Sequence, residues 1–228
     1  MSDEPIVADE IIDGVYRALC ANGYAALTMQ DIADECNKSK SLLHYHYDTK
    51  EDLLVAFLEA MLDHYETRLA EESERSPVDR LVSYIARFVF VPSDEERESF
   101  HLALLEMRSQ GPYNDRIREQ LVRSDELLRG TVEDILHDGI DEGVFEAVDV
   151  ERTAALLVAT LDGARTRQIT LSERPPADHT YTRIVAEEAI STLVEPLLAS
   201  DVELPTLDEV LERLAGERDE SFGTPEES

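Results

Sequence analysis

Apolar residues recur at intervals of three and four along most of the chain, and this spacing predicts amphipathic helices. The clearest stripe places Ile11, Ile12, Val15 and Leu19 on one face of a helix. No stretch combines alternating β-branched residues with hairpin turns. We therefore expect an all-α fold.

Turn and capping residues divide this pattern into separate helices. Gly23 ends the first helix, Thr28 and Ser39 cap two short helices, and Asn37 suits a left-handed turn between them. Thr206 followed by Glu209 matches a capping box at the start of a last short helix. The expected helices span 6–21, 28–35, 39–47, 50–74, 78–91, 94–109, 114–138, 150–171, 180–199 and 206–220.

The order of short and long helices indicates two domains. Three short helices fall within 5–65, and longer amphipathic helices fill 66–200. Residues 201–228 form an acidic C-terminal tail that holds the last short helix, and we expect the final eight residues to be disordered.

Charge normally argues against a nucleic-acid partner here, because 51 acidic residues outnumber 21 basic ones and give a net charge of −30. The basic residues comprise 18 Arg and only 3 Lys. Evenly spread acid with so little Lys resembles proteins of salt-accumulating halophilic archaea; an acidic protein of a mesophile is the alternative. In molar salt the Debye length falls to about 3 Å, so net charge no longer excludes DNA.

The sequence also bears on where the protein is located in the cell. No apolar run reaches the length of a membrane span, and the acidic N-terminal segment does not resemble a signal peptide. Two cysteines, Cys20 and Cys36, cannot build a disulfide scaffold. We expect a cytoplasmic protein with no membrane partner.

Residues 27–54, LTMQDIADECNKSKSLLHYHYDTKEDLL, carry the most specific motif. Three short helices with a tight turn before the third match a helix-turn-helix. The order of residues in this segment resembles the DNA-binding domain of the TetR/AcrR family of transcriptional regulators, and the resemblance extends over 6–65. The chain departs from the family pattern at Asn37, Lys38, Leu42 and His44, which leaves the fold unaffected and the base specificity open.

The resemblance implies a regulator, in most members a repressor, that binds a palindromic double-stranded DNA operator as a homodimer and responds to a small-molecule effector. All three lysines of the chain fall within one stretch of 13 residues inside this motif, which favours DNA binding over mere likeness of fold. The expected DNA-binding residues are Thr28, Lys38, Ser39, Lys40, Ser41, Leu42, His44, Tyr45, His46 and Lys50.

The later helices supply the remaining expectations. The segment EGVFEAVDVERTAALLVATLDGA is similar to the BetI-like branch of the family, a generic signal that names no effector. Residues expected to wall an effector cavity, although core packing also explains most of them, are Tyr84, Arg87, Phe88, Phe100, His101, Leu104, Met107 and Arg108. Residues expected in the dimer interface are Leu156, Leu157, Thr160, Leu161, Gly163, Ile190, Leu193, Val194 and Leu197.

Two other classes of function stay open at this point. One is a helical binding module on the same fold that has lost DNA binding, and the other is a small helical enzyme. The retained lysines argue against the first, and the absence of any nucleophile–base pattern or phosphate loop argues against the second. His44 and His46 point away from each other on a helix, so we expect no metal site, no catalytic residue and no cofactor.

Overall fold

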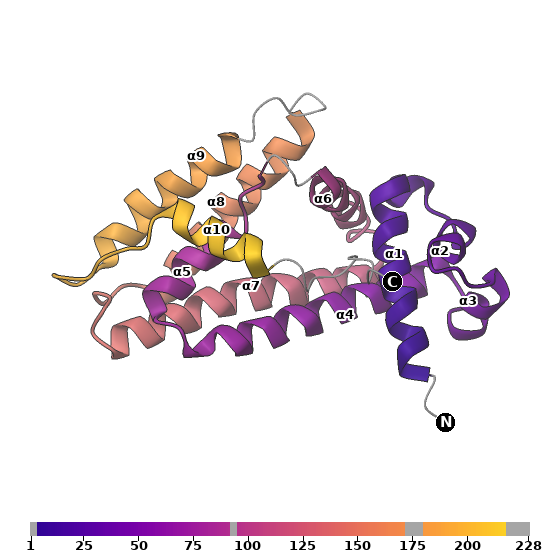
Figure 1. The fold of residues 1–228 in the computed structure, drawn as a ribbon, viewed down its shortest axis with the longest axis horizontal. Helices are drawn as coiled ribbons and strands as arrows, with labels where there is room; N and C mark the ends of the chain where they lie inside the picture. The colour runs from indigo at the N-terminus through magenta and orange to yellow at the C-terminus, as the bar shows by residue number, and fades with distance from the viewer. Residues whose placement is uncertain (1–3, 92–94, 172–179, 218–228) are drawn as a thin grey trace. The chain divides into compact units, whose positions relative to one another are not determined.

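The computed structural model describes residues 4–91, 95–171 and 180–217. Within these ranges the chain is helical apart from turns and one isolated antiparallel bridge between Phe145 and Leu198, which confirms the all-α prediction. None of the described helices is both long and apolar enough to cross a membrane. The helices labelled in Figure 1 are α1 Glu4–Ala26, α2 Met29–Glu35, α3 Lys40–His46, α4 Lys50–Glu71, α5 Pro77–Ala86, α6 Glu95–Arg108, α7 Asp115–Asp141, α8 Val150–Leu171, α9 Thr180–Ala189 and α10 Leu207–Glu217.

Two predicted helices differ from their apolar pattern, one in where it ends and the other in its helical type. The helix expected over 78–91 stops at Ala86, and the amide of Phe90 donates to the hydroxyl of Thr182 at 3.2 Å instead of extending the helix. The helix expected over 180–199 continues past α9 as a π-helical turn, Ile190–Val194, and a 3₁₀ turn, Glu195–Leu197. Tertiary hydrogen bonding thus sets the first end, which periodicity alone cannot show.

The described residues form two compact units. The first comprises 4–65 and 95–123, and the second comprises 66–91, 124–171 and 180–217. The first segment of the first unit ends at residue 65, but the unit is not continuous in sequence as the predicted domain 5–65 is. The structure adds α6 and the start of α7 to that unit, and it gives α10 to the second.

The first unit is built around the packing of α6 on α1, which lie side by side in Figure 1. Phe100 and Met107 of α6 are fully or almost fully buried in the same core as Leu19 of α1. The ring centroid of Phe100 lies 4.7 Å from that of Tyr16 and 5.9 Å from that of Phe57. Because α6 supplies these apolar side chains, the first 65 residues do not complete their own core.

Two glycines of α1 allow close approach in the first unit. A Cβ added at Gly14 would lie 2.6 Å from Cβ of Cys36, so α1 can cross the end of α2 only where a side chain is absent. Gly23 has a φ of 68° and breaks the helix where a turn was predicted.

Cys36 is buried, and its thiol lies 3.0 Å from the carbonyl oxygen of Ile32. Burial raises the pKa of both thiols, that of Cys20 to about 12, so both suit core packing better than redox chemistry.

The second unit has one hydrophobic core, to which α10 contributes as fully as the longer helices. Leu207, Val210, Leu211 and Leu214 of α10 are buried in this core. Arg213 adds an ion pair with Asp79 at 2.9 Å and a hydrogen bond to Ser83 at 2.8 Å, both on α5. The capping box predicted between Thr206 and Glu209 is present. The disorder expected at 221–228 lies outside the described residues.

We expect Phe100→Ala to destabilise the first unit, because it removes a fully enclosed ring from the core that α6 shares with α1. The loss in unfolding free energy should be about 3–5 kcal/mol. Chemical denaturation followed by circular dichroism would measure the loss, and hydrogen exchange would place it in α1 and α6. Val122→Ala, at an exposed position of α7 in the same unit, is the control and should change stability by less than about 0.5 kcal/mol. Unchanged protection of α1 in Phe100→Ala would contradict the assignment of α6 to this unit.

Candidate nucleic-acid interface

The helix-turn-helix is formed by α2, the turn at 36–39 and α3. Thr28 caps α2 in a complete capping box with Asp31, and its hydroxyl donates to the Asp31 carboxylate at 2.7 Å. Asn37 adopts a left-handed conformation with a φ of 50°. Ser39 caps α3 by accepting from the amide of Leu42 at 3.2 Å. These three local features agree with the sequence prediction.

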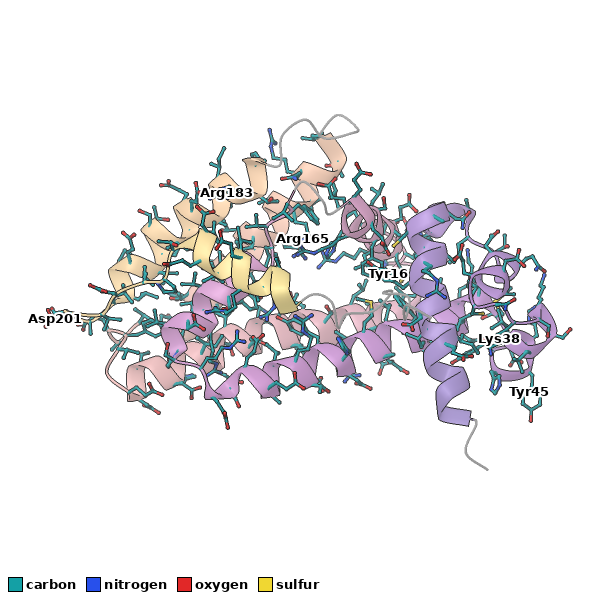
Figure 2. All side chains as sticks on the ribbon, in the orientation of Figure 1. Tyr16, Lys38, Tyr45, Arg165, Arg183 and Asp201 are labelled. Atoms are coloured by element: carbon teal, nitrogen blue, oxygen red, sulfur yellow. The ribbon has the colours of Figure 1, made fainter. Side chains whose placement is uncertain are left out.

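Buried apolar residues fix the angle between α2 and α3. Ile32, Ala33 and Leu43 have no exposed surface and belong to the core of the first unit. The opposite face of α3 is exposed, and the Tyr45 side chain points into solvent with 81% of its surface accessible (Figure 2). Leu42 is half-buried. The other exposed residues predicted to bind DNA are Thr28, which caps α2, and Ser39, Lys40, Ser41, His44 and His46.

Two of the three lysines expected to contact DNA are held by the chain itself. Lys38 forms an ion pair with Glu10 of α1, and its hydrogen bond to that carboxylate raises the pKa of its ammonium. Lys50 Nζ donates to the carbonyl oxygens of Leu27 at 3.0 Å and Tyr24 at 3.3 Å. Lys50 therefore fastens the start of α4 to the turn between α1 and α2. A role for Lys50 as a phosphate contact stays a prediction.

Lys40 is the lysine available to a ligand. Its side chain is exposed on α3, and it makes no hydrogen bond or ion pair within the residues that the structure describes. Thr28 is less available, because Asp31 takes the hydrogen of its hydroxyl and accepts from its amide at 2.8 Å. The exposed surface of α3, centred on Lys40 and Tyr45, is thus the part of the predicted site that remains accessible.

The turn between α1 and α2 is also held by a residue that the motif did not indicate. Glu106 of α6 accepts from the amide of Ala25 at 3.2 Å, and its carboxylate lies beside Gly23. Lys50 binds two carbonyl groups of the same turn. Both contacts are to backbone groups, which leave no signal in the sequence. Together they fix the entry to the helix-turn-helix.

The residues expected around an effector cavity divide between the two units. Tyr84 and Arg87, with Arg80, Glu72 and Asp134, line a cavity of about 190 Å³ in the second unit. Arg87 and Glu72 form a bidentate ion pair in its wall, with one contact at 2.9 Å.

The remaining residues of that prediction lie elsewhere. Phe88 is buried in the second unit, with the Arg165 guanidinium 4.1 Å from its ring centroid. The predicted residues on α6 all belong to the first unit. Phe100 and Met107 are buried in its core, and His101 and Leu104 are half-buried. Arg108 is exposed. The periodicity of α6 shows that it has a buried face but does not show which unit buries it.

Comparisons with known proteins agree with this geometry. Residues 11–57 match the family described as bacterial regulatory proteins, tetR family, and residues 77–195 match the BetI-type transcriptional repressor, C-terminal family. The chain is 28% identical to the HTH-type transcriptional regulator BetI of Rhizobium meliloti over 72% of this chain and 79% of that protein. It is 29% identical to the biofilm operon icaADBC HTH-type negative transcriptional regulator IcaR of Staphylococcus epidermidis, over 36% of this chain and only 45% of that protein.

One solved structure is similar to most of this chain. The TetR transcription regulator from Haloarcula marismortui shares 36% identity with a TM-score of 0.74, over 86% of this chain and 100% of that one. The fold and the exposed recognition helix define a helix-turn-helix transcriptional regulator. The chain belongs to the TetR family, and its C-terminal helices match the BetI-type branch of that family. These relatives are transcriptional regulators and not enzymes.

We expect Lys40→Ala to weaken DNA binding without changing stability, and Lys50→Ala to lower the melting temperature. Lys40 is exposed and unpaired among the described residues, whereas Lys50 makes two internal hydrogen bonds. Each phosphate contact contributes about −0.9 to the slope of log affinity against log salt concentration, so Lys40→Ala should reduce the slope by about 1. Mobility shift over a KCl series and thermal melting would measure both effects.

The wild-type protein itself should show a shallow salt dependence. Lys38 is paired with Glu10, and Arg17 donates to the carbonyl of Glu35 at 2.9 Å, so few cations are free to release counterions from DNA. We expect specific binding to persist in molar KCl. A steep, monotonic loss of affinity between low and high KCl would contradict this prediction, provided that the protein is shown to be folded at each concentration.

Proposed function

We propose that this chain is an effector-responsive repressor that binds a palindromic operator as a homodimer in the cytoplasm. The observation that carries the proposal is the exposed face of α3, where Lys40 and Tyr45 project from a helix-turn-helix with complete caps. Side chains on the forward part of such a helix reach base edges in the major groove. The match to a BetI-type repressor family and to the negative regulator IcaR supports repression as the mode of action.

A dimer is required because one helix-turn-helix reads only a short half-site. The surface that we propose for the partner chain lies on α8 and α9, where Leu156 is 54% exposed and Ile184 is 57% exposed. Ala155, Ala159 and Gly163 are exposed on the same face of α8, and a Cβ at Gly163 would meet nothing within 4 Å. These small residues leave room for a second helix.

This surface shares Leu156 and Gly163 with the one expected from sequence and differs from it in other residues. Four residues expected in the interface are instead buried in the core of the second unit, where a partner chain cannot contact them: Leu157, Leu161, Val194 and Leu197. Thr160, Ile190 and Leu193 are half-buried. Tyr181 and Ile184 of α9 are exposed apolar residues that the sequence prediction missed.

The effector site that we propose is the cavity in the second unit. Its volume, about 190 Å³, slightly exceeds the roughly 150 Å³ that holds a benzene molecule, so a small effector fits. Tyr84 offers an aromatic wall, and Glu72, Arg80, Arg87 and Asp134 offer charged groups. An effector alters DNA binding to the extent that it binds one conformation of the protein more tightly than the other.

The alternatives from the sequence are less well supported. A binding module that had lost DNA binding would have no need for the exposed Lys40 and Tyr45 on a capped recognition helix. The small helical enzyme is less well supported because the matching families and relatives are transcriptional regulators.

Genome-wide occupancy mapping followed by footprinting would test the proposed function. We expect protection of a palindrome whose two half-sites lie one or more helical turns apart, and higher expression of the adjacent gene when the protein is deleted. Binding without a two-fold sequence, or unchanged expression on deletion, would contradict the operator or the repressor assignment respectively.

We expect Leu156→Arg to convert the dimer into monomers and to weaken operator binding, because a buried, unpaired charge opposes association. Val122→Arg is the matched control, since Val122 is also apolar and 51% exposed but lies on α7 in the first unit. Light scattering at micromolar protein in molar KCl would report the oligomeric state. A wild-type monomer that still binds its operator specifically would refute the dimer.

A further inference from the structure

Arg116, in the first turn of α7, reaches the first turn of α4. Its Nη1 donates to Oδ1 of Asp52. The other carboxylate oxygen, Oδ2, accepts from the amide of Thr49 at 2.9 Å and from its hydroxyl at 2.7 Å. The hydrogen bonds from Thr49 and the ion pair with Arg116 lower the pKa of Asp52. One carboxylate therefore caps α4 and binds α7 at the same time.

The start of α4 is tied closely to the recognition helix. α3 ends at His46, and Tyr47 closes it by donating its amide to the carbonyl of Leu43 at 2.8 Å. Only Tyr47, Asp48 and Thr49 separate α3 from α4. His46, Tyr47 and Asp48 line one cavity of about 330 Å³ together with Asp52 and Arg116. A shift in the first turn of α4 therefore moves the end of α3.

Among the described residues, at least three polar contacts join α7 to α4 within the first unit. Arg116 pairs with Asp52, Gln120 donates to Glu59 at 3.0 Å, and Arg123 pairs with Asp63 at 2.7 Å. Residue numbers rise together along both helices, so the two segments run in the same direction. The Arg116 contact is the one beside the recognition helix, whereas the Arg123 contact lies three helical turns further along α4. Arg123 thus provides an internal control for an ion pair between the same helices.

We propose that Arg116 is a positioning residue for operator recognition: by holding Asp52 it fixes the first turn of α4 and the orientation of α3 on the DNA. The proposal rests on the proposed DNA-binding function. Arg116 does not touch DNA in this scheme. The Arg116 side chain is 58% exposed, so a direct phosphate contact is the competing explanation. The two explanations differ in how the loss of Arg116 depends on salt and on DNA sequence.

The test uses the full-length variants Arg116→Ala, Arg116→Lys and Arg123→Ala, with operator DNA and non-specific DNA over a KCl series. We expect Arg116→Ala to lower operator affinity about tenfold, equivalent to about 1.4 kcal/mol, at low and at molar KCl. Affinity for non-specific DNA should not change. Arg116→Lys, which keeps a charged donor to Asp52, should restore most of the affinity, and Arg123→Ala should stay within about twofold of wild type.

Other outcomes would overturn the proposal. An equal loss on operator and non-specific DNA that shrinks as KCl rises would make Arg116 a phosphate contact. An equal loss in Arg123→Ala, or no loss in Arg116→Ala, would remove any special role. If Arg116→Ala melts at a lower temperature than Arg123→Ala, a double-mutant cycle with Asp52→Asn replaces it, and additive effects on operator affinity would refute the coupling. Absence of operator binding by the wild-type protein would instead contradict the proposed function.

Discussion

The excess of carboxylates determines the partners of several cations near the helix-turn-helix. The chain has 51 acidic residues against 21 basic ones, so carboxylates are the most numerous charged partners for its ammonium and guanidinium groups. Lys38 pairs with Glu10, Arg17 with Glu35, and Arg116 with Asp52. Exposed pairs of this kind stabilise a fold weakly, but they fix the direction of long side chains. Most of the positive charge near the recognition helix is therefore already paired with groups of the protein before DNA binds.

This constraint changes what the clustered lysines mean. Three lysines beside the helix-turn-helix suggest three contacts to phosphate, yet Lys38 and Lys50 are held by groups of the protein. Lys40, the lysine without such a partner in the described part of the chain, sits on α3 beside the exposed Tyr45. With fewer free cations, we expect shape, aromatic contact and hydrogen bonding to bases to contribute more to DNA recognition than counterion release does.

Features that depend on residues a few positions apart could be predicted from the sequence. Thr28 and Asp31, Ser39, Asn37, and Thr206 with Glu209 all take the predicted roles, because a cap or a tight turn is decided within one helical turn. Periodicity likewise gave the helices and the all-α class. Periodicity could not show that Phe100 packs against Tyr16, or that Leu157 is buried while Leu156 is exposed. The spacing of apolar residues indicates that a helix has a buried face but does not indicate which helix packs against it. The partners of Lys50 are backbone carbonyls, which every residue possesses.

Helix α7 is the element on which these separate observations converge. It contributes Arg116 to the first unit, and it contributes Thr131, Asp134 and Ile135 to the wall of the cavity in the second. A small molecule in that cavity would thus contact the same continuous helix that binds the cap of α4. Allosteric control needs two sites and an element whose equilibrium both of them bias. In this chain α7 is a continuous helix that carries residues of the proposed effector cavity and the Arg116 contact to Asp52, so it is the element in which such coupling should be tested.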